Sequence, residues 1–365
     1  MASREISAVL EEPGKMSIQE FDIPAIGPEE ALLRVEMVGI CGSDPKYYHG
    51  EVAHCSYPTI LGHEMLGHIA AIGEIASSRY GVRVGDRVTL EASIPCGHCR
   101  YCLSGNYRIC DNKRGYGSRV PTTVAPSLWG AYGQFMYIAP GSVVHRVSPS
   151  VPAEAAVLAN AVIANGIQWV RIIGGASIAQ AVVVQGAGPQ GLAMTVAAKE
   201  SGAFPIIITG LSADQDRLEL AKEFGADYCI DVQQEDPVAR VQQITGGLMA
   251  DLVVDVTGSG QAIQKSLEMV RKQGTVICAG LAGVRNLTPL PTDSILSREI
   301  RFQGVLSKGT EAVIAAIKLI ESGRYPLEKM VTHKYPLEAA EEAVRAVGRE
   351  VPGISPIKAI LVPPP

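Results

Sequence analysis

The second half of the chain alternates short apolar segments with longer amphipathic ones, and this pattern limits the fold more than any other feature. Segments typical of strands cover residues 181–185, 206–209, 228–230, 251–256 and 275–280. Segments typical of helices lie between them, at residues 189–201, 216–224, 236–244 and 261–273. Strands separated by helices of this length pair in parallel through right-handed crossovers. We therefore predict a doubly wound α/β sheet here.

The first 150 residues follow a different pattern, in which short β-branched and apolar runs are interrupted by Gly, Pro and Asp. This is typical of a β-rich domain with substantial loops. Two further helical segments, residues 311–323 and 338–348, and a final apolar run end the chain. We expect this last part to return to the first domain. The predicted domains are therefore residues 1–155 with 310–365, and residues 156–309.

Composition excludes several classes of function. The 365 residues are 47% hydrophobic and 19% charged with a net charge of -5, which is typical of a globular protein and offers no positive field for nucleic acid. The longest uncharged run, residues 172–198, contains five glycines and Pro189, so we expect a buried strand, turn and helix rather than a membrane span. The first residues lack the features of a signal peptide, and we expect a cytoplasmic protein with no membrane partner.

Four of the eight cysteines lie within one short segment, CGHCRYCLSGNYRIC, as Cys96, Cys99, Cys102 and Cys110. Four thiolates on one loop can enclose a tetrahedral metal ion, and a loop without its own core gains its fold from that metal. Free thiols, two disulfides or an iron-sulfur cluster are the alternatives. Because the protein would supply all the ligands, we predict a structural zinc site.

A glycine-rich turn, VVVQGAGPQG, joins a predicted strand to a predicted helix and contains Gly186, Gly188, Pro189 and Gly191. At such a turn the backbone can approach a pyrophosphate, and the helix N-terminus stabilises its charge. A turn that serves only tight packing is the alternative. We predict a dinucleotide site.

The acidic residue that usually follows about 20 positions later, at the end of the second strand, is missing. Gly210 and Ser212 stand there, and Asp214 and Arg217 follow. Two interpretations remain open. Gly210, Ser212 and Arg217 would admit the 2′-phosphate of NADP, whereas Asp214 could reach the bare ribose of NAD from a longer turn. We expect NAD, with NADP as the alternative.

Four motifs occur in order along the chain: GICGSD at residues 39–44, GHE at residues 62–64, the four-cysteine segment and the glycine-rich turn. In this combination the chain resembles the zinc-dependent medium-chain alcohol dehydrogenases, which include polyol and threonine dehydrogenases. The resemblance covers essentially the whole chain. It implies a β-rich GroES-like catalytic domain and a Rossmann cofactor domain, an enzyme that oxidises alcohols, and a homodimer or homotetramer paired through a sheet edge near residues 301–307.

The resemblance also implies roles for individual residues. Cys41 and His63 would bind a catalytic zinc, and Cys96, Cys99, Cys102 and Cys110 a structural one. Asp44 would orient a ligand. Glu64 would bind zinc as well, although a buried acid paired with a cation is its alternative role. Ser43 would take the proton of the alcohol, unless it is only a turn residue. The nicotinamide would lie near residues that also fit ordinary strand-end turns: Asp255, Thr257, Gly258, Gly280, Leu281, Leu306 and Ser307.

Two departures from the family pattern leave questions open. Asn160 stands where many members have a third zinc ligand, and a neutral amide is a poor one, so Glu64 or a second water would complete the set. Lys46 stands where some members have a proton-relay histidine. Either the proton leaves by another route, through His49 or the ribose, or Lys46 is only a solvated charge.

Five loop residues of the first domain could line a substrate pocket or could pack in the core instead: Tyr47, Tyr48, Tyr116, Leu128 and Trp129. Because few other charged residues lie at these places, we expect an uncharged alcohol, secondary or cyclic. Three other functions remain possible: an NADPH-linked carbonyl reductase, a methyltransferase, and a nucleotide-binding protein without turnover.

Overall fold

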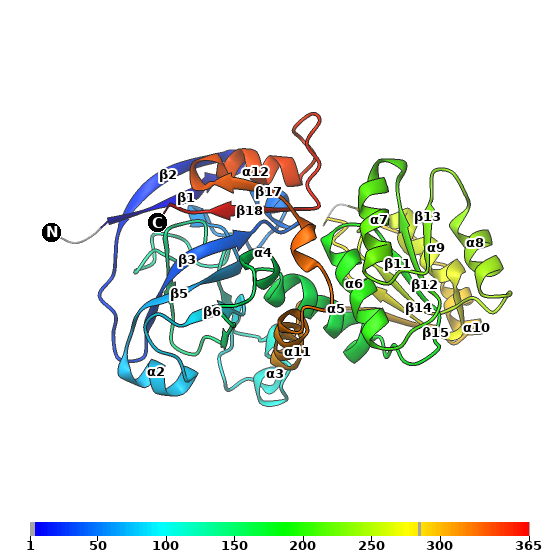
Figure 1. Cartoon of the computed structure of the whole chain (residues 1–365), viewed down its shortest axis with the longest axis horizontal. Coiled ribbons are helices and arrows are strands. Elements are labelled where there is room, and N and C mark those ends of the chain that lie inside the picture. The colour runs from blue at the N-terminus through cyan, green and yellow to red at the C-terminus, as the bar shows by residue number, and fades with distance from the viewer. Residues whose placement is uncertain (1–3, 284–285, 365) are drawn as a thin grey trace. The chain divides into compact units, whose positions relative to one another are not determined.

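The computed structural model describes residues 4–283 and 286–364. It divides into two compact units, Met1–Ala161 with Gly309–Pro365 and Val162–Lys308 (Figure 1). The chain therefore passes from the first unit to the second after Ala161 and returns after Lys308.

The first unit is rich in short strands, as the sequence predicts. Its strands are β1 (Arg4–Glu12), β2 (Lys15–Asp22), β3 (Ala31–Gly39), β4 (Thr59–Ile60), β5 (Glu64–Ile72), β6 (Arg87–Leu90), β7 (Ser93–Ile94), β8 (Arg114–Gly115), β9 (Phe135–Ile138), β10 (Val144–Arg146), β17 (Val331–Pro336) and β18 (Lys358–Val362). Its α-helices are α1 (Asp44–Tyr48), α2 (Glu74–Tyr80), α3 (Arg100–Leu103), α4 (Ala153–Ala156), α11 (Thr310–Glu321) and α12 (Ala340–Val347).

Strand β3 is the centre of the first unit. It lies in a seven-stranded sheet of order β10-β6-β5-β3-β18-β17, and it also pairs with β9. Seven of its nine residues are buried, which suits an apolar strand covered on both faces. Strand β18 pairs antiparallel with β3, so a strand from the end of the chain completes the sheet to which β3 belongs.

The second unit is the doubly wound sheet that the alternating pattern predicts. Its strands are β11 (Val182–Gln185), β12 (Ile206–Gly210), β13 (Tyr228–Asp231), β14 (Ala250–Asp255), β15 (Val270–Cys278) and β16 (Arg301–Gly304). Its α-helices are α5 (Ala164–Gly166), α6 (Pro189–Glu200), α7 (Gln215–Glu223), α8 (Pro237–Ile244), α9 (Gly260–Met269) and α10 (Thr292–Ser297).

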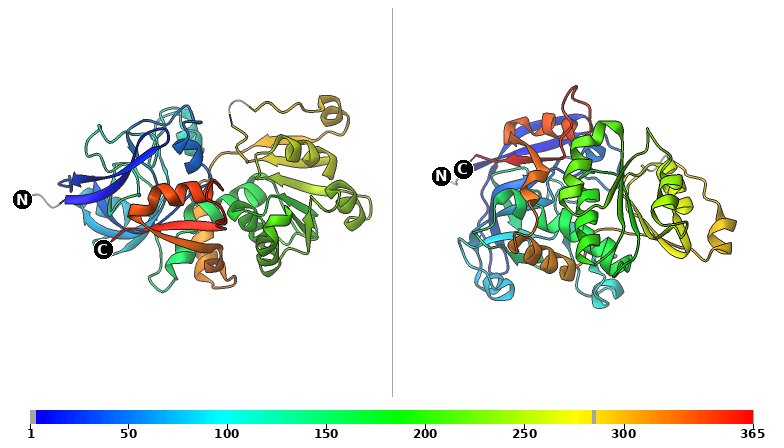
Figure 2. Two further views of the ribbon diagram at one scale, coloured as in Figure 1. Left: turned by 90° about the horizontal axis from the view of Figure 1, so that it is seen from above. Right: turned by 45° about the vertical axis from the view of Figure 1, so that its right-hand side comes forward.

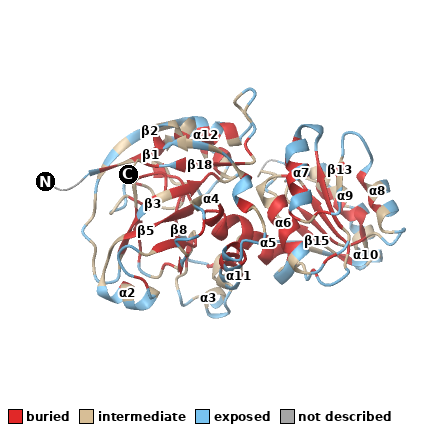
Figure 3. Ribbon diagram, in the orientation of Figure 1, coloured by how far each residue is buried: buried red, intermediate tan, exposed pale blue. Residues whose placement is uncertain are grey.

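The six strands run parallel in the order β13-β12-β11-β14-β15-β16. Helices α6 and α7 lie on one face and α8 and α9 on the other (Figures 1 and 2). The central strands β11, β12 and β14 are consequently the most buried part of the sheet, while the outer faces of the helices are exposed (Figure 3). The order changes direction at β11, where a doubly wound sheet binds its ligand.

One helix is shorter than the sequence predicts. The predicted helix over residues 261–273 ends at Met269, and β15 already begins at Val270. The guanidinium of Arg298 donates hydrogen bonds to the carbonyls of Leu267, at 2.6 Å, and Val270. These bonds satisfy one carbonyl in the last turn of the helix and the carbonyl of the residue that follows it, which suits a helix end at Met269.

A continuous helical segment, Ala153–Ile173, links the two units and contains π-helical turns. By length and composition it could cross a membrane, and it is the one such helix in the described ranges. However, 78% of its most apolar window is buried inside the protein, as in a core helix. The uncharged run at residues 172–198 instead forms the end of this segment, then β11 and most of α6.

Candidate active site

Cys41, His63 and Glu64 come together because β3 and β5 are antiparallel neighbours. Cys41 lies two residues after β3, His63 directly precedes β5, and Gly39 pairs with Glu64 in the sheet. The Cys41 sulfur, one His63 ring nitrogen and one Glu64 oxygen all lie within 4.8 Å of one another. The pairing of the two strands therefore builds a group of three potential metal ligands.

Asp44 is fully buried behind these residues. One carboxylate oxygen accepts hydrogen bonds from the Cys41 backbone N–H and the Tyr132 hydroxyl, both at 2.8 Å. The other lies 3.6 Å from Nδ1 of His63 and has no hydrogen-bond partner among the described residues. Asp44 thus fixes the backbone that carries the thiol and faces one nitrogen of the imidazole, which leaves the other for a metal.

Glu64 is also fully buried, and its counter-charge comes from the far end of the chain. The ammonium group of Lys358, on β18, forms an ion pair with Oε2 of Glu64 and donates a 2.8 Å hydrogen bond to the carbonyl of Ile40. Gly39 leaves room for this pair, since a Cβ at that position would lie 2.3 Å from Oε2 of Glu64. The structure is therefore compatible with both roles considered for Glu64. As a possible zinc ligand it lies beside Cys41 and His63, and as a buried acid it is paired with Lys358.

The electrostatics of this group suit a cation. Burial disfavours the charged imidazole, but Asp44, Cys41 and Glu64 together raise the pKa of His63 to about 9. Burial also raises the pKa of Asp44, against the opposing effects of His63 and two hydrogen bonds. A thiolate, an imidazole and a carboxylate are ligands that zinc accepts, and the unpartnered Asp44 oxygen behind them supplies further negative charge. The residues therefore fit a zinc ion.

Asn160, the residue at the expected position of a third ligand, is fully buried in a π-helical turn. Its side-chain N–H donates to the carbonyl of Leu90, while its oxygen has no hydrogen-bond partner within the described chain. Thr89 pairs with Leu66, so Leu90 lies beside Met65, the residue after Glu64.

The residues considered for proton transfer differ in their surroundings. Ser43 is the N-cap residue of α1, yet its hydroxyl makes no capping hydrogen bond to that helix. His49 is exposed, and its Nε2 lies 2.6 Å from the Glu350 carboxylate. Ser43 therefore keeps its hydroxyl for another partner, whereas His49 is held at the surface.

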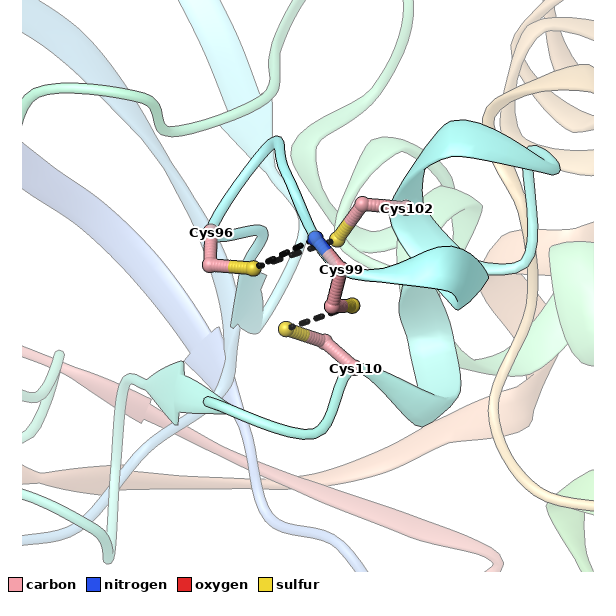
Figure 4. Close-up of side chains that lie close together, drawn as sticks. All are labelled: Cys96, Cys99, Cys102 and Cys110. Carbon is pink, nitrogen blue, oxygen red and sulfur yellow. Dashed lines mark hydrogen bonds between the residues drawn. The ribbon is translucent and has the colours of Figure 1, made fainter.

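The four-cysteine segment folds into a loop whose sulfur atoms face one another (Figure 4). The Cys96 and Cys102 sulfurs are 3.9 Å apart, and those of Cys99 and Cys110 are 3.8 Å apart. A tetrahedral zinc with Zn–S bonds of about 2.3 Å requires sulfurs about 3.8 Å apart, whereas a disulfide requires about 2.05 Å. A backbone hydrogen bond from His98 lowers the pKa of Cys96 to about 6, whereas burial raises the pKa of Cys102 to about 12. The loop therefore fits a four-thiolate metal site rather than disulfides.

A buried carboxylate that sequence reasoning missed ties this loop to the rest of the unit. Glu91 accepts hydrogen bonds from the hydroxyls of Tyr107 (2.6 Å) and Thr310 (2.9 Å), and lies 3.0 Å from Nε2 of His145. Tyr107 stands between Cys102 and Cys110, and Thr310 opens α11. A lone glutamate after a strand carries no sequence signal for such a network.

Most of the side chains expected to line a substrate pocket are core residues instead. Tyr116, Leu128 and Trp129 are buried, and the Tyr116 hydroxyl and Trp129 indole are hydrogen-bonded to their neighbours. Tyr48 is also buried and donates a 2.6 Å hydrogen bond to Glu341. Tyr47 is only half-buried. Four of the five therefore take the alternative role of packing, because their side chains belong to the buried core of the β-rich unit.

The glycine-rich turn in the second unit has the geometry that close approach to a pyrophosphate requires. Gly186 follows β11 with φ of +106°, a conformation that favours glycine. A Cβ on Gly191 would lie 1.7 Å from the Gly186 carbonyl oxygen, so only glycine closes this turn. Pro189 occupies the first turn of α6, and Gly188 is its N-cap. The turn therefore exposes backbone at the helix N-terminus.

The turn after β12 contains the residues considered for ribose recognition. Asp214 accepts a hydrogen bond from the Leu211 N–H at 3.1 Å and forms an ion pair with Arg217 at 3.4 Å. Ser212 donates a 2.6 Å hydrogen bond to Asp231, a carboxylate that sequence reasoning did not include. Asp214 and Arg217 are both buried, so their charges largely satisfy each other.

The residues expected near the nicotinamide lie at or near the ends of β14, β15 and β16. The buried Asp255 accepts a 2.6 Å hydrogen bond from the Thr257 hydroxyl, and Gly280 packs so closely on Gly258 that a Cβ there would lie 2.1 Å from the Gly258 nitrogen. Ser307 has φ of +57°, and its carbonyl accepts a hydrogen bond from Trp169. Leu281 and Leu306 are exposed.

Comparisons with known proteins agree with this arrangement. Residues 27–149 match the alcohol dehydrogenase GroES-like domain, and residues 189–322 match the zinc-binding dehydrogenase domain. The chain is 40% identical to a "Probable alcohol dehydrogenase" of Mycobacterium tuberculosis over 97% of both chains. It is 33% identical to the erythritol/L-threitol dehydrogenase of Mycolicibacterium smegmatis, over 96% of this chain and 95% of that one.

The fold is also that of a solved alcohol dehydrogenase from Thermotoga maritima. The two structures match with a TM-score of 0.90 at 27% identity, over 99% of this chain and all of the other. The chain thus belongs to the zinc-dependent medium-chain dehydrogenases, as an oxidoreductase that acts on alcohols with zinc and NAD(P).

Proposed function

We propose that this alcohol dehydrogenase oxidises its substrate at the group formed by Cys41, His63 and Glu64. The observation that carries the proposal is the convergence of their ligand atoms within 4.8 Å, with Asp44 buried behind them. Cys41 and His63 would hold the zinc ion. Glu64 would complete the ligand set when it moves from Lys358, and a water molecule would do so otherwise.

A bound zinc ion acts as a Lewis acid and lowers the pKa of an alcohol hydroxyl toward neutrality. The chain's own residues then have separate tasks. Asp44 orients Cys41 through its backbone and His63 through Nδ1. Ser43, whose hydroxyl is not used to cap α1, would accept the proton of the alcohol and pass its own hydroxyl proton on toward solvent. The turns that contain Thr257, Gly280, Leu281, Leu306 and Ser307 would hold the nicotinamide ring, which when bound would supply the hydride acceptor.

We further propose two zinc ions per chain, one catalytic and one structural at Cys96, Cys99, Cys102 and Cys110. The separate groups of ligands support this number. The pyrophosphate of the cofactor would lie at Gly186, Gly188, Pro189 and Gly191. NAD is the proposed cofactor rather than NADP, since carboxylates border the turn formed by Gly210, Ser212, Asp214 and Arg217.

The proposed substrate is an uncharged alcohol, secondary or cyclic. Among the lysines and arginines of the described residues, Lys358 forms the one ion pair with this group, and Glu64 already neutralises it. The group therefore offers little positive charge to a substrate anion. We also propose a cytoplasmic homodimer or homotetramer. Strand β16 supports pairing of chains because it lies at an edge of the six-stranded sheet.

The test combines metal analysis with turnover. Wild-type protein should hold two zinc ions and reduce NAD with secondary, cyclic or polyol alcohols. Cys41→Ala should hold one zinc ion and lose turnover, whereas the control Cys55→Ala, which removes another half-buried free thiol, should keep both. Alcohol oxidation by Cys41→Ala at the wild-type rate would overturn the proposal.

A further inference from the structure

We propose that Asp231, at the end of β13, is the residue that selects NAD over NADP. The inference rests on the proposed NAD-linked function and goes beyond it by naming the discriminating side chain. A carboxylate accepts hydrogen bonds from the bare adenosine ribose of NAD and repels the 2′-phosphate of NADP. The carboxylate usually stands at the end of the second strand of the fold, and here that strand, β12, ends at Gly210.

The register of the sheet places Asp231 where the missing acid would be. Strands β12 and β13 run parallel, and Gly210 pairs directly with Asp231. The Val232 N–H then donates a 3.0 Å hydrogen bond to the Gly210 carbonyl. The ends of the two strands are thus adjacent, and the Asp231 carboxylate lies next to the turn that begins at Leu211.

Hydrogen bonds hold this carboxylate toward the turn. One oxygen accepts the Ser212 hydroxyl at 2.6 Å, and the other accepts the Gln233 N–H at 2.9 Å. The Gln233 side chain in turn accepts the Ser212 N–H at 3.0 Å. Ser212 and Asp231 therefore form one connected unit in which the carboxylate is already oriented.

Packing disfavours an acid at Gly210, the last residue of β12. A Cβ at Gly210 would lie 3.1 Å from a methyl carbon of Leu218 and 3.3 Å from the Ala187 Cβ. Both contacts are tighter than ordinary van der Waals contact, and any side chain larger than a methyl group would require more room. The neighbouring strand is therefore the place from which a carboxylate can reach this turn without disturbing α7.

The charges of the turn point the same way. Arg217, which would favour a 2′-phosphate, is only 8% exposed and faces Asp214. By contrast, no lysine or arginine of residues 4–283 and 286–364 forms an ion pair with the half-buried Asp231. The charge of Arg217 is thus neutralised by Asp214, whereas that of Asp231 is not neutralised by a cation within the described residues. The turn therefore disfavours an additional phosphate.

Binding of the reduced cofactors tests the inference directly. The dissociation constants of NADH and NADPH would be measured by nicotinamide fluorescence for wild-type protein, Asp231→Asn and Ser212→Ala. We expect wild type to prefer NADH. Asp231→Asn should shift the ratio of the two constants toward NADPH by about tenfold or more, because one charge near the phosphate is removed. Ser212→Ala should weaken NADH binding and keep the carboxylate's repulsion of NADPH.

Asp227→Asn is the matched control. Asp227 directly precedes the first residue of β13, and its carboxylate accepts a 2.7 Å hydrogen bond from the Ile206 N–H. This variant should leave the ratio of the constants unchanged, and thermal melting of each variant shows whether it is folded. An unchanged ratio in folded Asp231→Asn would overturn the role of Asp231 alone. Failure of wild type to bind either cofactor would overturn the proposed function and this inference with it.

Discussion

Lys358, on the last strand of the chain, neutralises Glu64 at the start of β5 and also donates a hydrogen bond to the residue before Cys41. A single ammonium group therefore contacts both segments that carry the proposed metal ligands. Lys358 is 3% exposed and Glu64 is fully buried, so neither charge is solvated in the absence of the other. The end of the chain is thus part of the site.

Replacement of Lys358 by methionine should destabilise the fold strongly. The change leaves the Glu64 carboxylate buried without a counter-charge, which costs about 3 to 5 kcal/mol. Chemical unfolding measures the loss. Lys334→Met is the control, because its ion pair with Glu154 is at the surface and should be worth less than about 1 kcal/mol. Equal losses of unfolding free energy in Lys358→Met and Lys334→Met would show that the Glu64 carboxylate does not depend on Lys358 for its counter-charge.

Asp44→Asn should weaken zinc binding at the catalytic group by about 10- to 100-fold, since such partners orient the ligands that bind the metal. A competition assay with a chromophoric chelator measures the affinity without reference to turnover. Tyr132→Phe removes one of the two 2.8 Å hydrogen bonds to Asp44 and should have a smaller effect in the same direction. Unchanged zinc affinity in Asp44→Asn would show that Asp44 does not position the ligands.

Glu5 should make the protein less stable as the pH rises from about 4.5 to 7. Burial raises its pKa from 4.5 to about 7, despite hydrogen bonds from Ser7, Phe135 and Gln134. In this window the folded state binds more protons than the unfolded state, so the free energy of unfolding falls with pH, by up to about 3 kcal/mol. Denaturant unfolding at pH 5 and pH 8 measures the change.

The matched variant for this prediction is Glu5→Gln, which keeps the shape of the side chain and removes its charge. It should be more stable than wild type at pH 8, and the difference should shrink at pH 5. Glu12→Gln, at the exposed end of the same strand, should leave the pH dependence unaltered. If Glu5→Gln and wild type lost stability equally between pH 5 and pH 8, another group would be responsible.

Tyr107→Phe should loosen the four-cysteine loop. The variant removes the hydroxyl that donates to Glu91 at 2.6 Å, and a lost hydrogen bond to a charged group is worth about 1.5 to 3 kcal/mol. We expect a lower melting temperature and faster release of the structural zinc to a chelator. Tyr101→Phe, on the same loop with an exposed hydroxyl that accepts from Arg100, should release zinc at the wild-type rate. Identical release from both variants would argue against an anchor at Glu91.

The sequence by itself determined the features that depend on near neighbours in the chain. The alternation after residue 181, the glycine-rich turn and the spacing of Cys96, Cys99, Cys102 and Cys110 are local patterns, and each predicts one local structure. Even so, the end of α9 was placed four residues too late, because Arg298, about 30 residues further along the chain, satisfies the carbonyl of Leu267 in its last turn and that of Val270 just after it.

Only the tertiary structure decided which distant residues meet. The pairing of Lys358 with Glu64, of Asp231 with Ser212, and of Glu91 with Tyr107 and Thr310 depends on which strands are neighbours and on their register. Likewise, Tyr116 and Trp129 resemble pocket residues in sequence but are buried in the core. Such contacts join residues far apart in the chain. Local spacing predicts helices, strands and turns, but it does not predict which of these elements pack against one another.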